Sequence, residues 1–99
     1  MLYAIIGQDT PNSLAMRKAA RPAHIERLQA LHAEGRLVLA GPCPAIDAAD
    51  PGPAGFSGSL IVAEFASLAE AEAWVSEDSY VQEGVFDTVT VKPFLQAMP

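Results

Sequence analysis

A histidine and an aspartate far apart in the chain, His24 and Asp78, have the side chains needed for proton-transfer chemistry. An imidazole can accept a proton near neutral pH, and a carboxylate that holds one ring nitrogen orients the other nitrogen toward a substrate. Each residue also has a simpler interpretation, His24 as a packed histidine bonded to the backbone and Asp78 as a turn at a helix end. Whether the two can act together depends on the fold.

Half of the positive charge of the chain lies within five residues, at Arg17, Lys18 and Arg21. Guanidinium groups bind carboxylates and other oxyanions through paired hydrogen bonds. Close to His24, the cluster could clamp the carboxylate or phenolate of a substrate, and we assign that role to Arg17 or Arg21. The alternative is a solvated turn without a ligand.

Small and polar residues near predicted strand ends offer further groups for substrate binding. They are Gly41, Pro42, Ser57 and Ser59, whose backbone and hydroxyl groups either orient a ligand or simply form turns. The single cysteine, Cys43, has no basic neighbour or helix start to activate it, so we interpret it as an ordinary thiol. The chain lacks a metal-ligand set and a glycine-rich phosphate-binding motif, so we predict no metal and no cofactor.

Four predicted strands form the frame that must position these residues. Apolar or alternating segments predict strands over residues 2–8, 37–40, 57–65 and 88–92. The Pro- and Gly-rich stretch 41–56, between the second and third strands, predicts a long loop without regular structure.

Two helices are predicted from the residues at their ends. Pro22 favours a first helical position, which predicts the main helix over 23–34 and leaves 13–20 as a short helical turn. A Ser-x-x-Glu capping box that begins at Ser67 predicts a second helix up to about residue 77.

This β-α-β-β-α-β order predicts a ferredoxin-like α+β fold, with a four-stranded antiparallel sheet and both helices on one face. The first and fourth strands are then neighbours, and the start of the main helix lies near the end of the second helix. His24 and Asp78 are thereby brought together. A helix N-terminus favours the neutral imidazole and a carboxylate favours the imidazolium, so the two effects predict a base poised near neutral pH.

Length and composition limit the classes of partner. The chain has 99 residues, 51% of them hydrophobic, and a formal net charge of -6. This length fits a single domain over residues 1–99. Negative charge argues against nucleic acid and anionic membranes as partners. A single cysteine, without a targeting or membrane-spanning segment, predicts a cytoplasmic protein.

The helix-free face of the predicted sheet favours self-association. Strand residues 2–6 and 60–63 carry apolar side chains toward both faces of the sheet, but helices cover only one face. Because monomers rarely leave such a patch exposed, we predict a homodimer in which two sheet faces pack together.

Short motifs recur along the chain in a specific order: Arg21-Pro22-Ala23-His24, Glu34-Gly35-Arg36-Leu37, Ala40-Gly41-Pro42, Ala54-Gly55-Phe56-Ser57-Gly58-Ser59 and Asp78-x-Tyr80. In this order and spacing they resemble the YciI (YCII-related) family over nearly the whole chain. The resemblance implies a dimeric α+β barrel with a His/Asp-centred site, matched here by His24 and Asp78. The family commonly has Pro where this chain has Ser79.

Two classes of function follow. The first is a small cofactor-independent enzyme that isomerises a small anionic or cyclic metabolite, or eliminates a group from it, with His24 as base and Asp78 as its orienting partner. The alternative is a non-catalytic protein that binds a small molecule in the same pocket, or an accessory protein.

Overall fold

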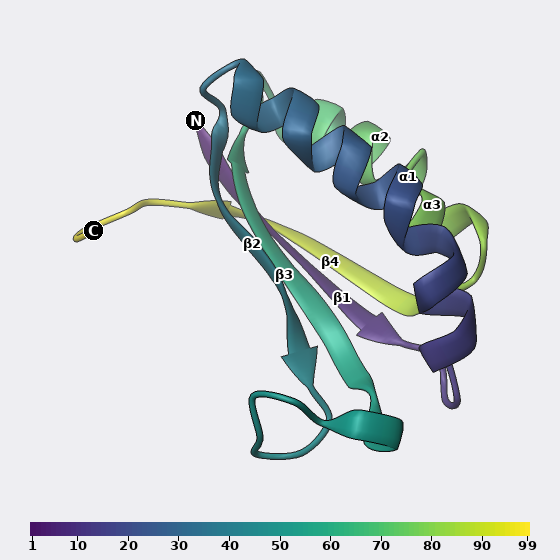
Figure 1. The fold of residues 1–99 in the computed structure, drawn as a ribbon. Helices are drawn as coiled ribbons and strands as arrows, with labels where there is room; N and C mark the ends of the chain where they lie inside the picture. Colours follow the sequence, from purple (N-terminus) through teal and green to yellow (C-terminus); the bar gives the residue numbers. More distant parts are fainter.

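The computed structural model describes residues 1–99 as one sheet with helices packed against it (Figure 1). Along the chain the elements are β1 (Leu2–Asp9), α1 (Leu14–Ala33), β2 (Leu37–Pro44), a 3-10 turn (Gly52–Ala54), β3 (Phe56–Glu64), α2 (Leu68–Ser76), α3 (Ser79–Gln82) and β4 (Phe86–Phe94). The strand order is β2-β3-β1-β4, and every neighbouring pair is antiparallel. The predicted ferredoxin-like α+β topology is confirmed.

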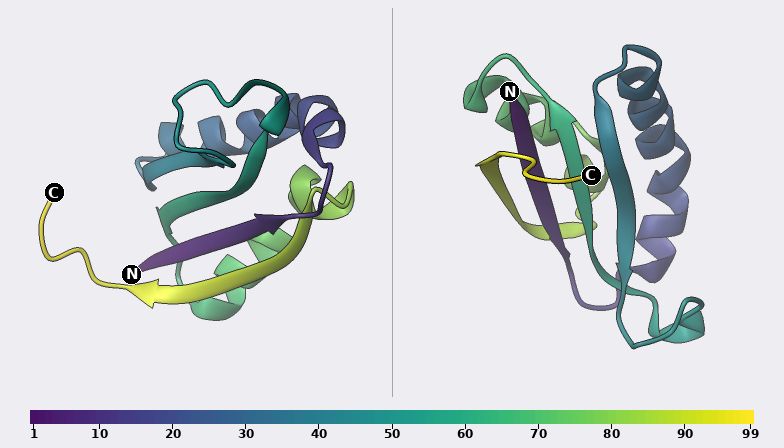
Figure 2. Two further views of the ribbon diagram at one scale, coloured as in Figure 1. Left: turned by 90° about the horizontal axis from the view of Figure 1, so that it is seen from below. Right: turned by 90° about the vertical axis from the view of Figure 1, so that its left-hand side faces the viewer.

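The core lies between the helices and one face of the sheet (Figure 2). Residues of β1 alternate between the two faces, so that Tyr3 and Ile5 are buried against the helices whereas Ile6 is 39% exposed on the other face. Leu28 and Leu31 of α1 are buried in the same core as Val75 of α2. One face of the sheet is therefore packed, and the other stays open in the single chain.

The main helix begins earlier than the sequence suggested. α1 is continuous from Leu14 to Ala33 and contains Pro22, so the predicted boundary at this proline is wrong. Pro22 removes one helical hydrogen bond, but it lies on the exposed side of α1, where water can bond to the freed carbonyl. A buried stripe on the opposite side holds the helix to the sheet: Arg17, Ala20, His24, Leu28 and Leu31. None of the helices is long and apolar enough to cross a membrane.

The strands and the second helical region also differ from the prediction. Residues 41–44, predicted as loop, continue β2, and Gly52–Ala54 forms a 3-10 turn in the same predicted loop. β2 is an edge strand, so Pro42 and Pro44 do not interrupt a ladder on its outer side. The segment Ser79–Gln82, which follows the predicted second helix, forms the helical turn α3.

Candidate functional site

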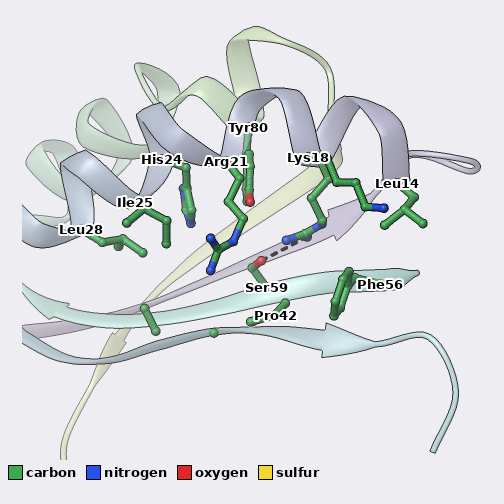
Figure 3. Close-up of a pocket in the computed structure, with 13 residues that line it drawn as sticks. Leu14, Lys18, Arg21, His24, Ile25, Leu28, Pro42, Phe56, Ser59 and Tyr80 are labelled. Carbon is green, nitrogen blue, oxygen red and sulfur yellow. Dashed lines mark hydrogen bonds between the residues drawn. The ribbon is translucent and has the colours of Figure 1, made fainter. Parts of the chain in front are cut away.

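A cavity of about 350 Å³ lies between α1 and the sheet (Figure 3). Its walls come from α1, β2, β3 and α3: Leu14, Arg17, Lys18, Arg21, His24, Ile25, Leu28, Ala40, Gly41, Pro42, Phe56, Ser59 and Tyr80. Three cationic side chains and one imidazole line it, but no carboxylate does, although acidic residues outnumber basic ones two to one in the chain. The cavity therefore offers an anion a more favourable environment than the rest of the surface.

His24 and Asp78 are in direct contact beside this cavity. Nδ1 of His24 lies 2.8 Å from Oδ2 of Asp78, and the Asp78 side chain is 1% exposed. Asp78 is also the N-cap of α3, because the same Oδ2 accepts a hydrogen bond from the backbone N–H of Tyr80 at 3.0 Å. Asp78 therefore caps a helix end and pairs with His24 at the same time.

A second cation, Arg27, binds the other oxygen of Asp78. Its Nη1 donates to Oδ1 at 3.0 Å, and its Nη2 donates to the carbonyl of Trp74 at 2.8 Å. Arg27 was not among the predicted site residues, although it follows His24 by three positions and thus shares a helix face with it. Burial raises the pKa of Asp78, but the hydrogen bond and charge of His24, the Tyr80 amide and Arg27 outweigh it, and the pKa lies below its ordinary value.

The ionised Asp78 determines which nitrogen of His24 faces the cavity as an acceptor. A carboxylate at Nδ1 fixes the proton on that nitrogen, so in the neutral ring Nε2 carries the lone pair. Nε2 forms no hydrogen bond within the chain, and the imidazole lines the cavity wall. The ring stacks on Tyr80, with centroids 3.9 Å apart and an interplanar angle of 12°. His24 can thus act as a proton acceptor toward a bound molecule.

His24 lies at a different position in its helix than predicted. His24 was expected in the first turn of a helix, where the helix dipole would favour the neutral ring. It lies instead near the middle of α1, and the dipole acts mainly within the terminal turns. The carboxylate of Asp78 and the stacked ring of Tyr80 are the neighbours that determine its environment.

Arg17, which we predicted as an anion clamp, is already paired inside the protein. Its Nε and Nη2 donate to the two oxygens of Asp9 at 2.9 and 2.6 Å. Nη2 also donates to the carbonyl of Gly58 and, at 3.1 Å, to Oγ of Ser59. Asp9 compensates the charge of Arg17, so Arg17 is held as part of the cavity wall.

Two exposed cations at the cavity remain free to meet a ligand. Lys18 and Arg21 both line the cavity, and neither forms an ion pair or a hydrogen bond within the chain. Arg21 was predicted for this role. Lys18 was noted only as part of the cluster, and the structure places it beside Arg21 on the same wall (Figure 3).

The remaining predicted residues divide between the cavity and its surroundings. Gly41, Pro42 and Ser59 line the cavity. Ser57 does not, because its side chain is exposed and its hydroxyl donates to the carbonyl of Cys43 at 3.4 Å. Asp78 lies behind His24, outside the lining. Nowhere in the chain do three or more His, Cys, Asp or Glu side chains gather as metal ligands, so no residue is assigned to a metal.

Tyr80 is a second site residue that was not predicted from the sequence. It belongs to α3, is only 2% exposed, and packs edge to face on Phe86 with ring centroids 5.4 Å apart. Burial raises the pKa of the Tyr80 phenol above its ordinary value, against the charge and hydrogen bond of Arg17 and the charge of Arg21. The only signal in the sequence was the Asp78-x-Tyr80 spacing, to which no role had been attached.

Comparison with known proteins gives a consistent match over the whole chain. The model of the YCII-related domain matches residues 1–95. Protein YciI of Escherichia coli O6:H1 is 57% identical over 94 residues, which cover 95% of this chain and 96% of that protein. An uncharacterized protein of Haemophilus influenzae is 50% identical over 94 residues, with the same coverage of both chains.

One solved structure is similar along nearly its whole length. It is the 5-chloro-2-hydroxyhydroquinone dehydrochlorinase of Burkholderia phenoliruptrix, in complex with 2,5-dihydroxybenzoquinone. Its TM-score is 0.86 at 25% sequence identity, and the match covers 98% of this chain and 96% of that chain. The fold described above is therefore also the fold of an enzyme that binds a small cyclic molecule.

Proposed function

The chain belongs to the YCII-related domain family, and on that premise we propose that it is a small cofactor-independent enzyme for proton transfer. The observation that carries the proposal is the buried His24–Asp78 pair, whose free nitrogen Nε2 faces a cavity without carboxylates. The reaction class is isomerisation or elimination, because both begin when a base removes a proton from the substrate.

His24 and Asp78 have separate tasks in this reaction. Nε2 of His24 accepts the proton, and Asp78 holds the ring in the required tautomer and stabilises the imidazolium that forms. Arg27 binds the second oxygen of Asp78 at 3.0 Å, which keeps the carboxylate ionised and aligned. The base is therefore oriented before the substrate arrives.

The substrate is a small anionic or cyclic molecule. A volume of about 350 Å³ is at the lower end of the range for small-molecule sites. The apolar walls formed by Leu28, Pro42 and Phe56 accommodate a ring, and Lys18 and Arg21 at the mouth attract a carboxylate or phenolate. The dehydrochlorinase of the same fold, which binds 2,5-dihydroxybenzoquinone, supports this choice of substrate class.

The test is a screen of small anionic and cyclic metabolites by thermal shift, followed by turnover assays on the ligands found. We expect His24→Ala to lose turnover of a substrate by roughly 10²–10⁴-fold, as removal of a general base does. The matched control is His32→Ala, because His32 lies exposed on the same helix and outside the cavity. Ligand binding without turnover in the wild-type protein would favour the alternative function, a non-catalytic binding protein.

We also propose that the protein is a homodimer that packs two open sheet faces together. Ile6, Leu39 and Leu60 are each more than a third exposed on that face, where they form an apolar patch. Sedimentation at about 10 μM should give the mass of a dimer, and Ile6→Asp should give a monomer. Leu68→Asp is the control, because Leu68 is equally exposed but lies on α2.

A further inference from the structure

The hydroxyl of Tyr80 is a polar group that the proposed reaction has not yet used. Tyr80 is 2% exposed. Arg17 reaches its hydroxyl as a hydrogen-bond partner but has only donors, so no protein group accepts the phenol proton. Tyr80 lines the cavity between α1 and the sheet, and its hydroxyl is the polar side-chain atom that it brings to this wall. Figure 3 shows it pointing from the helical layer toward the sheet, on the side of Ser59.

The ring that carries this hydroxyl is held in place from several sides. One face stacks on His24, the guanidinium of Arg17 lies 4.7 Å from the ring centroid, and Phe86 packs against it edge to face. The backbone N–H of Tyr80 is bound by Asp78, the residue that also orients His24. The base and the phenol are therefore fixed relative to one another, both at the wall of one cavity.

The phenol is a hydrogen-bond donor under ordinary conditions. Burial raises its pKa above the usual value even though Arg17 and Arg21 oppose the shift. The hydroxyl thus keeps its proton at neutral pH and can donate it in a hydrogen bond to an oxygen of a bound molecule.

We propose that Tyr80 is a catalytic residue, whose hydroxyl donates a hydrogen bond to the substrate oxygen that becomes negative when His24 removes a proton. The inference rests on the proposed function and narrows its substrate to an enolisable cyclic compound with a carbonyl oxygen beside the acidic C–H. The phenol keeps its own proton throughout. Such a donor is most effective where it is pre-oriented and shielded from water.

The step balances without a further reactant. Nε2 of His24 takes the proton from carbon, and the electron pair of the broken C–H bond moves into the carbonyl to form an enolate. In an elimination, that pair returns to expel an anion from the neighbouring carbon, and the imidazolium then releases its proton to that anion or to water. In an isomerisation, the imidazolium returns the proton to a different carbon. In both cases Tyr80 stabilises the enolate oxygen.

The first measurement uses a probe in which the negative oxygen is already present. 2,5-Dihydroxybenzoquinone, which is ionised at neutral pH, should bind the wild-type protein at least tenfold more tightly than it binds Tyr80→Phe, because a hydrogen bond to a charged oxygen is lost. Tyr80→Phe keeps the ring that stacks on His24. Tyr3→Phe is the matched control, because Tyr3 is a core tyrosine outside the cavity, and it should bind as the wild type does.

The second measurement follows proton removal itself. In D₂O, the wild-type protein should exchange the α-protons of 3-oxocyclohexanecarboxylate, and Tyr80→Phe should do so roughly 10²-fold more slowly, as measured by NMR. Unchanged affinity for the quinone together with unchanged exchange in Tyr80→Phe would overturn the role of Tyr80 and leave the proposed function standing. If the wild type binds the quinone through Tyr80 but exchanges no proton, the donor remains and the proposed function fails. If the wild type neither binds the quinone through Tyr80 nor exchanges a proton, the role of Tyr80 and the proposed function both fail.

Discussion

Two buried carboxylates flank α1, and they are paired in different ways. Asp9 accepts two hydrogen bonds from Arg17 and a third from Ser13. Asp78 binds His24 through a single nitrogen and leaves the other nitrogen at the cavity wall. Both carboxylates are almost completely buried, with 2% and 1% of their side-chain surfaces exposed.

The two pairs differ in whether the partner of the carboxylate can change its charge. Asp9 and Ser59 fix the guanidinium of Arg17, which cannot give up its proton in a protein. The imidazole of His24 can gain and lose a proton, and its second nitrogen has no partner in the chain. The Asp9–Arg17 pair is therefore a structural element. The Asp78–His24 pair can take part in chemistry, because the imidazole can change its charge.

The largest expected effect is on the reactive pair. His24→Ala and Asp78→Asn should each lower turnover by roughly 10²–10⁴-fold, and the double variant should lose little more than the stronger single variant, because Asp78 acts by orienting His24. Asn is chosen because its side-chain oxygen can still cap α3. The measurement is a double-mutant cycle on kcat/KM, and strictly additive losses would rule out a joint role.

A comparably large effect, on stability rather than turnover, is expected at the other pair. Asp9→Ala leaves the guanidinium of Arg17 buried without its counter-charge, which should cost about 3–5 kcal/mol of unfolding free energy. The matched control is Glu34→Ala, which breaks the exposed pair with Arg36 and should cost less than about 1 kcal/mol. Urea unfolding measures both, and similar losses for the two variants would contradict the structural role of Asp9.

An intermediate effect is expected on the free energy of unfolding at acidic pH. The native pKa of Asp78 is lowered, so the native state holds this carboxylate ionised more strongly than the unfolded chain does. The resulting stability is present above the ordinary pKa of about 3.9 and is lost as pH falls through the lower native value. The stability difference between wild type and Asp78→Asn should therefore shrink as pH falls below about 4. A difference that stays constant down to pH ~2 would count against the ionised pair.

The smallest expected effect is at Arg27. Its side chain is 25% exposed, so Arg27→Met should cost only about 1–2 kcal/mol of stability through the loss of its hydrogen bonds to Asp78 and to the Trp74 carbonyl. The rate should also fall, because Asp78 is less firmly held. Arg36→Met is the control, since Arg36 contacts Phe65 and Glu34 away from the cavity and should leave the rate unchanged.

The architecture and the meeting of His24 with Asp78 were predictable, because both follow from the order of the elements. The continuity of α1 was not, because Pro22 is a strong local signal for a helix start. The opposing signal lies in the spacing of Arg17, Ala20 and His24, which place one face of a single helix toward the core. A buried arginine in that stripe is difficult to recognise before its carboxylate is known.

The partners of the site were harder to predict than its centre. Arg17 contacts Asp9 only because the end of β1 turns directly into α1 and places the carboxylate beside the first turn of that helix. Tyr80 lies in α3, a helix of four residues, which is too short to show any periodicity. Ser79 begins this turn, and its hydroxyl donates to the carbonyl of Ala20 at 2.8 Å, joining α3 to α1.

Asp78 performs two tasks with one oxygen, since Oδ2 receives both the imidazole of His24 and the amide of Tyr80. The shortest α-helix of the molecule and the base are therefore held by a common acceptor, and an opening fluctuation of α3 also releases His24. Amide hydrogen exchange at Tyr80 thus reports the fraction of molecules in which Asp78 no longer holds His24 in place. A ligand that occupies the cavity and contacts His24 should slow the exchange of the Tyr80 amide, even though the ligand does not contact that amide.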